Sequence, residues 1–188
     1  MSLTDLLVPA YVQMLRALLA WLEKAQKQLP EAEAETLLSA RLAPDMYPLS
    51  TQIRFACLQA LEAVSYLRGE PRPELLDQLV REGQNAGDQP GSVAEAQARI
   101  GEALALLGEL ESDALDDGAG RSIEIELPNG MIFDMTGETY ARDWAIPQFH
   151  FHLITAYAIL RSRNIDLGKA DYVQHMFAYL RPGTMPES

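Results

Sequence analysis

Apolar residues recur at steps of three and four positions in four long stretches of the chain, and this spacing predicts amphipathic helices. The first stretch begins near Leu6 and ends at Pro30. The second is expected from Pro48 to Leu67, since proline suits the first helical position and Gly69 follows as a stop signal. The predicted buried faces are Leu7, Tyr11, Leu15, Leu18 and Leu22 in the first stretch, and Leu49, Ile53, Ala56, Ala60, Val64 and Leu67 in the second.

The other two long helices are predicted by a capping signal and by the same apolar spacing. Ser92 and Glu95 form an S-x-x-E capping box, which opens a helix at Val93. The last long helix is expected from about residue 139 to residue 163. Pro147 lies inside it and should kink or divide it, because proline removes a hydrogen bond of the helix. Shorter helices are expected within residues 31–47, 73–82 and 172–180.

The spacing changes from helical to alternating between residues 122 and 135. Apolar residues occupy every second position on both sides of Asn129-Gly130. This pair favours a two-residue hairpin turn, since both residues tolerate a positive φ. The sequence therefore predicts a single domain, residues 1–188, of the all-α class: a four-helix bundle with a small β-hairpin inserted before the last long helix.

Composition and charge narrow the possible partners. The chain has 188 residues, 48% of them hydrophobic, and a formal net charge of -12. Nucleic acid is a poor partner for such a chain, because phosphate binding needs clustered lysine and arginine. An anionic membrane surface is disfavoured for the same reason. The apolar run in the first helix contains Gln13 and Arg16, which argues against a membrane span. With no basic leader visible, we expect a cytoplasmic protein. The one cysteine, Cys57, lies among apolar residues and is expected to be a buried hydrophobe.

Candidate chemistry centres on His150 and His152, one residue apart in the last helix. Residues two apart on a helix point about 200° apart, so these two cannot share one metal ion. The helical spacing places His152 on the shoulder of the buried face and His150 at the edge. The third histidine, His175, lies in the C-terminal tail with no motif around it.

Three segments together resemble an uncharacterised bacterial family of the DinB/YfiT-like superfamily, known only as a domain of unknown function. They are ARLAPDMYPLSTQI at the second helix, PQFHFHLITAYAILR in the last helix, and LGKADY near the C-terminus. The resemblance covers nearly the whole chain and implies a DinB-type bundle whose helices run up-down-down-up. It also suggests a homodimer.

Many members of that superfamily carry a three-histidine metal site, with one ligand on the second helix and an H-x-x-x-H pair on the last. This chain departs from the pattern. The residues four positions from His152 are Gln148 and Ala156, and residues 1–149 contain no histidine. We therefore expect no metal and no other cofactor. If a metal does bind, the ligands to test are His152 with Asp45 or His175.

We still expect a polar pocket around His152, even without a bound metal. The loop of residues 43–48 is expected at the same end of the bundle as the Pro147 kink, so that polar side chains converge in an apolar mouth. The predicted pocket residues are Asp45, Tyr47, Gln52, Gln148 and His152. A contact between Asp45 and His152 would orient the imidazole for general base catalysis. Alternatively, Asp45 caps the second helix and Gln52 bonds a loop carbonyl.

Three functions stay open on the sequence alone. The first is a small-molecule-binding or partner-binding bundle that lacks the full metal site. The second is a DinB-type transferase or hydrolase with an atypical metal site. The third is a structural dimeric module in which the polar residues only set the helix register.

Overall fold

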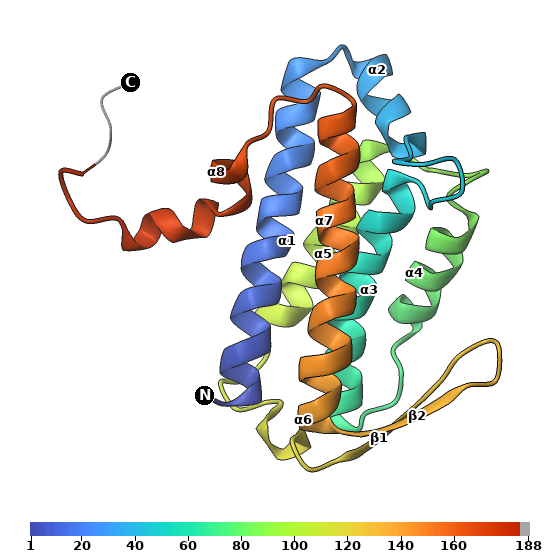
Figure 1. The fold of residues 1–188 in the computed structure, drawn as a ribbon, viewed down its shortest axis with the longest axis vertical. Coiled ribbons are helices and arrows are strands. Elements are labelled where there is room, and N and C mark those ends of the chain that lie inside the picture. The colour runs from blue at the N-terminus through green and yellow to red at the C-terminus, as the bar shows by residue number, and fades with distance from the viewer. Residues whose placement is uncertain (185–188) are drawn as a thin grey trace.

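Four long helices form a bundle in the computed structural model, which describes residues 1–184 (Figure 1). They are α1 (Leu3–Gln28), α3 (Leu49–Arg68), α5 (Val93–Gly108) and α7 (Ile146–Ser162). A fifth helix, α4 (Glu74–Asn85), lies along α3. The short elements are α2 (Glu31–Thr36), a 3₁₀ turn (Leu37–Ser39), a 3₁₀ turn (Asp116–Gly118), α6 (Gly137–Tyr140), α8 (Lys169–Tyr172) and a 3₁₀ segment (Gln174–Tyr179).

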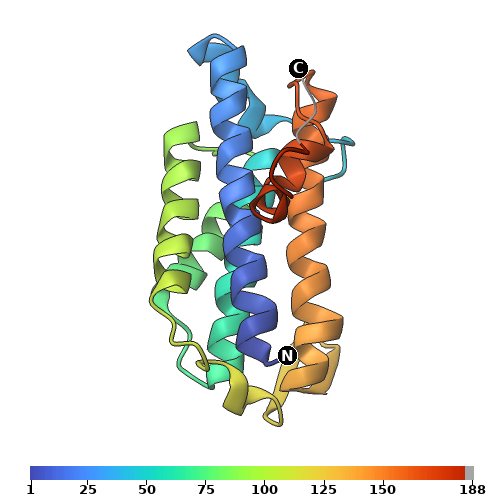
Figure 2. The same ribbon diagram turned by 90° about the vertical axis from the view of Figure 1, so that its left-hand side faces the viewer.

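The helices run up-down-down-up, as the resemblance implied. At one end of the bundle, Gln97 of α5 donates a hydrogen bond to Gln26 of α1. At the other end, the Leu115 N–H donates to the hydroxyl of Thr4, so α1 and α5 are antiparallel. In Figure 1, α4 carries the chain back along α3, and α5 then descends in the same direction as α3. In Figure 2, α5 and α7 lie on either side of α1.

The first helix is a core helix of this bundle. Helix α1 is long and apolar enough to cross a membrane by length and composition alone. Its buried face, however, packs inside the bundle: Tyr11 meets Phe149 with ring centroids 4.7 Å apart, and Trp21 meets Tyr157 at 5.3 Å. Pro9 lies within the helix without ending it. The cytoplasmic location stays a prediction.

The last long helix contains a π-helical turn just before its proline. Helix α6 continues through a π turn, Ala141–Ala145, into α7. In that turn the N–H of Ile146 bonds the carbonyl of Ala141, five residues back. Pro147 directly follows this turn, so the hydrogen bond that its missing N–H cannot make falls where the helix is already irregular. The predicted interruption of the last long helix is therefore the π-helical turn at Ala141–Ala145, just before Pro147.

The predicted hairpin is confirmed. Strands β1 (Ser122–Glu126) and β2 (Ile132–Thr136) pair antiparallel, with Ser122 opposite Thr136 and Glu126 opposite Ile132. Gly130 in the turn has φ 83°, whereas Asn129 does not take a positive φ. The turn is longer than the expected two-residue turn, since the N–H of Leu127 bonds the carbonyl of Met131 across residues 128–130. Ile123 and Ile125 of β1 are buried, whereas most of β2 faces outward. The hairpin lies across the end of the bundle where α3 ends and α6 begins (Figure 1).

The C-terminal segment is tied to α1 and then projects from the bundle (Figure 1). The indole N–H of Trp21 donates to the carbonyl of Asp171 at 3.2 Å, and Lys24 pairs with the Asp171 carboxylate at 3.0 Å. Beyond this anchor, Phe177 and Tyr179 are exposed. The tail is thus held at its start and carries apolar side chains into solvent.

Candidate functional site

A chain of hydrogen bonds joins His152 on α7 to the loop before α3. The Gln52 side chain donates from Nε2 to the main-chain carbonyl of Tyr47 at 3.2 Å. This leaves Gln52 Oε1 as an acceptor, 2.9 Å from Nδ1 of His152. The Nδ1 atom must therefore carry the proton, and Nε2 of the same ring is the unprotonated nitrogen. The loop carbonyl thus sets the tautomer of the imidazole through Gln52.

Burial keeps this imidazole neutral. His152 is 9% exposed, and the rings of Phe55 and Phe151 lie edge-on to it at 5.3 and 5.4 Å. Desolvation lowers the pKa of His152 from 6.5 to about 4. A neutral imidazole can accept a hydrogen bond at Nε2 throughout the neutral range. With a pKa this low it is a weak base, so the arrangement suits recognition better than proton abstraction.

The other predicted site residues are only partly assembled around His152. Asp45 is exposed and, within residues 1–184, its side chain makes no hydrogen bond. It does not cap α3, whose N-cap is Pro48. The Tyr47 ring is half exposed and meets Phe55 at 6.0 Å, and Gln148 is half-buried one turn before His152. The structure therefore joins Gln52, His152 and the Tyr47 carbonyl and leaves Asp45 outside.

One expected placement was wrong: the loop of residues 43–48 and the interruption near Pro147 lie at different levels of the bundle. Because α3 and α7 are antiparallel, Gln52 at the start of α3 meets His152. Tyr66 near the end of α3 meets Tyr140, just before the π turn, with ring centroids 5.4 Å apart. The loop therefore faces the middle of α7, while the irregular part of that helix lies beside the hairpin.

The two other histidines point elsewhere. His150 is half-buried and its Nδ1 lies 2.9 Å from the carbonyl of Ile146 in its own helix, so the predicted difference between the two neighbours is confirmed. His175 lies against α1, beside Gln13 and Arg16. Across the described part of the chain, no group of three or more His, Cys, Asp or Glu is placed to hold a metal ion. Whether a metal binds at all stays a prediction.

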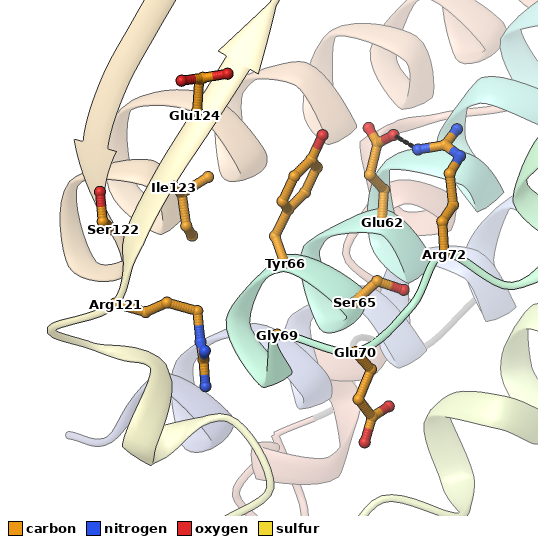
Figure 3. Close-up of a pocket in the computed structure, with 10 residues that line it drawn as sticks. All are labelled: Glu62, Ser65, Tyr66, Gly69, Glu70, Arg72, Arg121, Ser122, Ile123 and Glu124. Atoms are coloured by element: carbon orange, nitrogen blue, oxygen red, sulfur yellow. Dashed lines mark hydrogen bonds and ion pairs between the residues drawn. The ribbon is translucent and has the colours of Figure 1, made fainter.

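A cavity of about 410 Å³ lies where α3 ends beneath β1 (Figure 3), and sequence reasoning missed it. The phenol of Tyr66 points into its centre, with Ile123 and Glu124 of β1 on one side and Glu62 on the other. None of the five predicted pocket residues lines it. The lining residues are Glu62, Ser65, Tyr66, Gly69, Glu70, Arg72, Arg121, Ser122, Ile123 and Glu124. They come from two segments, residues 62–72 and 121–124, that lie far apart in the sequence, so no local pattern could single them out.

Both arginines of this cavity are already held by other groups. Arg72 pairs with Glu62 and, at 2.9 Å, with Asp77. Arg121 donates to the main-chain carbonyls of Leu67 at 3.2 Å and Arg68 at 3.3 Å, the last carbonyls of α3. Arg121 thus acts as a cap on the C-terminal end of that helix. Arg72 is thus neutralised by carboxylates. Arg121 keeps its positive charge, because main-chain carbonyls carry no net charge, but its guanidinium points to the end of α3 and away from the Tyr66 hydroxyl (Figure 3).

Comparisons with known proteins add a family and a structural relative. The sequence matches the family described as "Domain of unknown function (DUF1993)" over residues 3–173. Among solved structures, the chain is similar to the crystal structure of a DinB family member protein from Shewanella denitrificans. That similarity has 30% sequence identity and a TM-score of 0.72, and it covers 98% of this chain and 96% of the other. No curated protein matches the sequence.

Proposed function

The chain belongs to the DUF1993 family, and on that premise we propose that it is a DinB-like protein that binds a small molecule without a three-histidine metal site. We place the ligand in the cavity beneath the hairpin (Figure 3) and assign it to the class of small organic cations, such as primary ammonium compounds. The observation that carries this proposal is the ring of Tyr66 at the centre of the cavity, near the carboxylate of Glu124, which makes no ion pair within residues 1–184.

Two features of the cavity favour a cation. Glu124 faces it and makes no ion pair among residues 1–184. The ring of Tyr66 offers a π face, on which a cation gains about 0.5–1 kcal/mol at an exposed site. The net charge of -12 adds attraction of the same sign at longer range.

Matched probes test the sign of the charge. We propose an amide NMR titration with n-butylammonium and, separately, with butyrate, at constant ionic strength. The ammonium ion should shift the signals of Tyr66 and Glu124 in a saturable way, and butyrate should not. Equal binding of the two probes, or ammonium shifts that map elsewhere, would contradict the proposal.

Two substitutions refine this test. Glu124→Gln should weaken ammonium binding by about threefold, the size expected for an exposed charge. Tyr66→Leu should weaken it by a similar factor through the loss of the π face. Glu23→Gln, which removes an exposed carboxylate from α1, is the matched control and should leave the affinity unchanged.

A second candidate is a DinB-type transferase or hydrolase with an atypical metal site, and one observation favours it. His152 is held as a single tautomer by Gln52, with Nε2 unprotonated, as an imidazole that binds a metal must be. Elemental analysis of protein purified without added metal tests this reading. Stoichiometric zinc, nickel or iron that is lost in His152→Ala would move it ahead of the binding proposal.

A further inference from the structure

A second cavity, of about 450 Å³, opens between α3, α4 and α5, on the side of α3 that faces away from His152. Its lining combines three arginines with two carboxylates, two amides and a glycine: Arg54, Arg81, Arg99, Glu82, Glu95, Asn85, Gln89 and Gly91. Gln52 and Arg54 are two residues apart on α3 and so point about 200° apart. The two sites therefore lie on opposite sides of the same helix.

Arg54 is the unusual member of this lining, because it is a charged side chain that is only 3% exposed. Its Nε donates to Glu82 at 3.1 Å, and its Nη1 donates to the hydroxyl of Ser50 at 2.7 Å. The remaining nitrogen, Nη2, makes no hydrogen bond within residues 1–184. Two nitrogens thus fix the guanidinium, and the third is left without a partner.

Gly91 shapes the wall beside that free nitrogen. Its φ is 72°, a conformation that favours glycine. A Cβ at this position would lie 2.9 Å from Nη2 of Arg54 and 2.6 Å from a carboxylate oxygen of Glu95. The hydroxyl of Ser50 also donates to the carbonyl of Pro90 at 2.5 Å, which holds the same loop against α3. The chain therefore passes close to the guanidinium only because residue 91 has no side chain.

Among the side chains that line this cavity, arginines outnumber carboxylates, three to two. Glu82 is shared by Arg54 and Arg99, and its two oxygens lie 3.1 and 2.6 Å from Arg99 nitrogens. Glu95 is engaged in the capping box of α5, where it accepts the N–H of Ser92 at 2.7 Å. Arg81 is exposed and has no ion pair among the described residues. Glu102 bonds the outer nitrogen of Arg99 and does not line the cavity.

We infer that this cavity binds the oxyanion group of a small molecule, a carboxylate or a phosphate, between Arg54 and Arg81. Planar guanidinium groups bind such oxygens through paired N–H donors. The side-chain amides of Asn85 and Gln89 supply neutral donors at the rim. This site is independent of the proposed cation site, which lies at the other end of α3 and has the opposite charge preference.

A purely structural role is the competing explanation, since the group of Arg54, Glu82 and Arg99 also ties three helices together. Arg81 separates the two explanations because it takes no part in that group. Arg81→Gln should leave the urea unfolding curve unchanged and weaken anion binding. Arg142→Gln is the matched control: it removes an exposed arginine that pairs only with its neighbour Asp143.

The probes are inorganic phosphate and acetate, each titrated at constant ionic strength against sodium chloride and followed by amide NMR. We expect saturable shifts in residues 81–95 with at least one probe. Phosphate binding alone identifies a phosphate-bearing ligand, and acetate binding identifies a carboxylate; either supports the site. Arg81→Gln should weaken that binding by about three- to fivefold, and Arg142→Gln should not. Arg54→Gln should weaken it by about tenfold or more if the variant folds.

Two results would overturn the inference. One is the absence of saturable shifts around Arg54 with both probes, or shifts that chloride reproduces at the same ionic strength. The other is an equal loss of affinity in Arg81→Gln and Arg142→Gln, which would show only a general effect of net charge. Both comparisons use variants expected to fold, so the outcome does not depend on Arg54→Gln.

Discussion

Replacing His152 by glutamine should make the protein less sensitive to acid between pH 7 and pH 5. In the folded protein burial lowers the pKa of His152 from 6.5 to about 4. Between pH 6.5 and pH 4, His152 therefore binds a proton in the unfolded chain but stays neutral in the folded chain. The stability that the neutral imidazole contributes is fully present above about pH 6.5 and is lost as the pH falls towards 4.

The magnitude follows from the size of the shift. One pKa unit corresponds to about 1.4 kcal/mol, so the full loss is about 3 kcal/mol, of which about 2 kcal/mol falls between pH 7 and pH 5. Glutamine keeps a neutral donor that can reach Gln52 and does not titrate. His152→Gln should therefore be less stable than the native protein at pH 7 and recover about 2 kcal/mol relative to it at pH 5.

Urea unfolding of both proteins at the two pH values measures this difference, and titrating carboxylates cancel because both proteins share them. His150→Gln, a change to a half-buried histidine on the same helix, is the control and should show no recovery of that size. If the stability difference between the native protein and His152→Gln is the same at pH 7 and pH 5, the buried neutral imidazole is refuted.

The remaining predictions concern the metal, two packing sites and assembly. Protein purified without added metal should contain no stoichiometric zinc, nickel or iron, and elemental analysis that finds one would refute this. The hydroxyl of Tyr140 is buried without a hydrogen-bond partner in the described structure, so Tyr140→Phe should raise the free energy of unfolding by about 1 kcal/mol. A clear decrease of that free energy in urea unfolding would contradict this, since it would mean that the hydroxyl does make a hydrogen bond. A Cβ at Gly137 would lie 1.9 Å from the carbonyl oxygen of Gly118, so Gly137→Ala should destabilise the protein by about 2 kcal/mol or more, and an unchanged melting temperature would contradict the packing at the hairpin. We propose a homodimer that covers the exposed Phe177 and Tyr179 of the tail, and light scattering that gives the mass of one chain at high concentration would exclude it.

Local signals in the sequence were enough to predict the elements. The capping box at Ser92 and Glu95 is present, α3 ends at Gly69 with φ 64°, and the hairpin turns at Asn129-Gly130. The different burial of His150 and His152 also followed from helix geometry alone. These features depend on neighbouring residues, whose spacing is fixed by the backbone of one helix or one turn.

Contacts between helices were decided only by the tertiary structure. Periodicity shows which side of a helix is buried, but not how far along its axis the neighbouring helix meets it. The structure joins Gln52 to His152, two residues that the sequence analysis named together, whereas the expected meeting of the loop before α3 with Pro147 was wrong. Arg54 lies beside the apolar stripe of α3, and no local pattern indicates that Glu82 would reach it from α4. The cavities around Tyr66 and Arg54 each combine residues from distant segments, and only the packing of the whole bundle sets those distances.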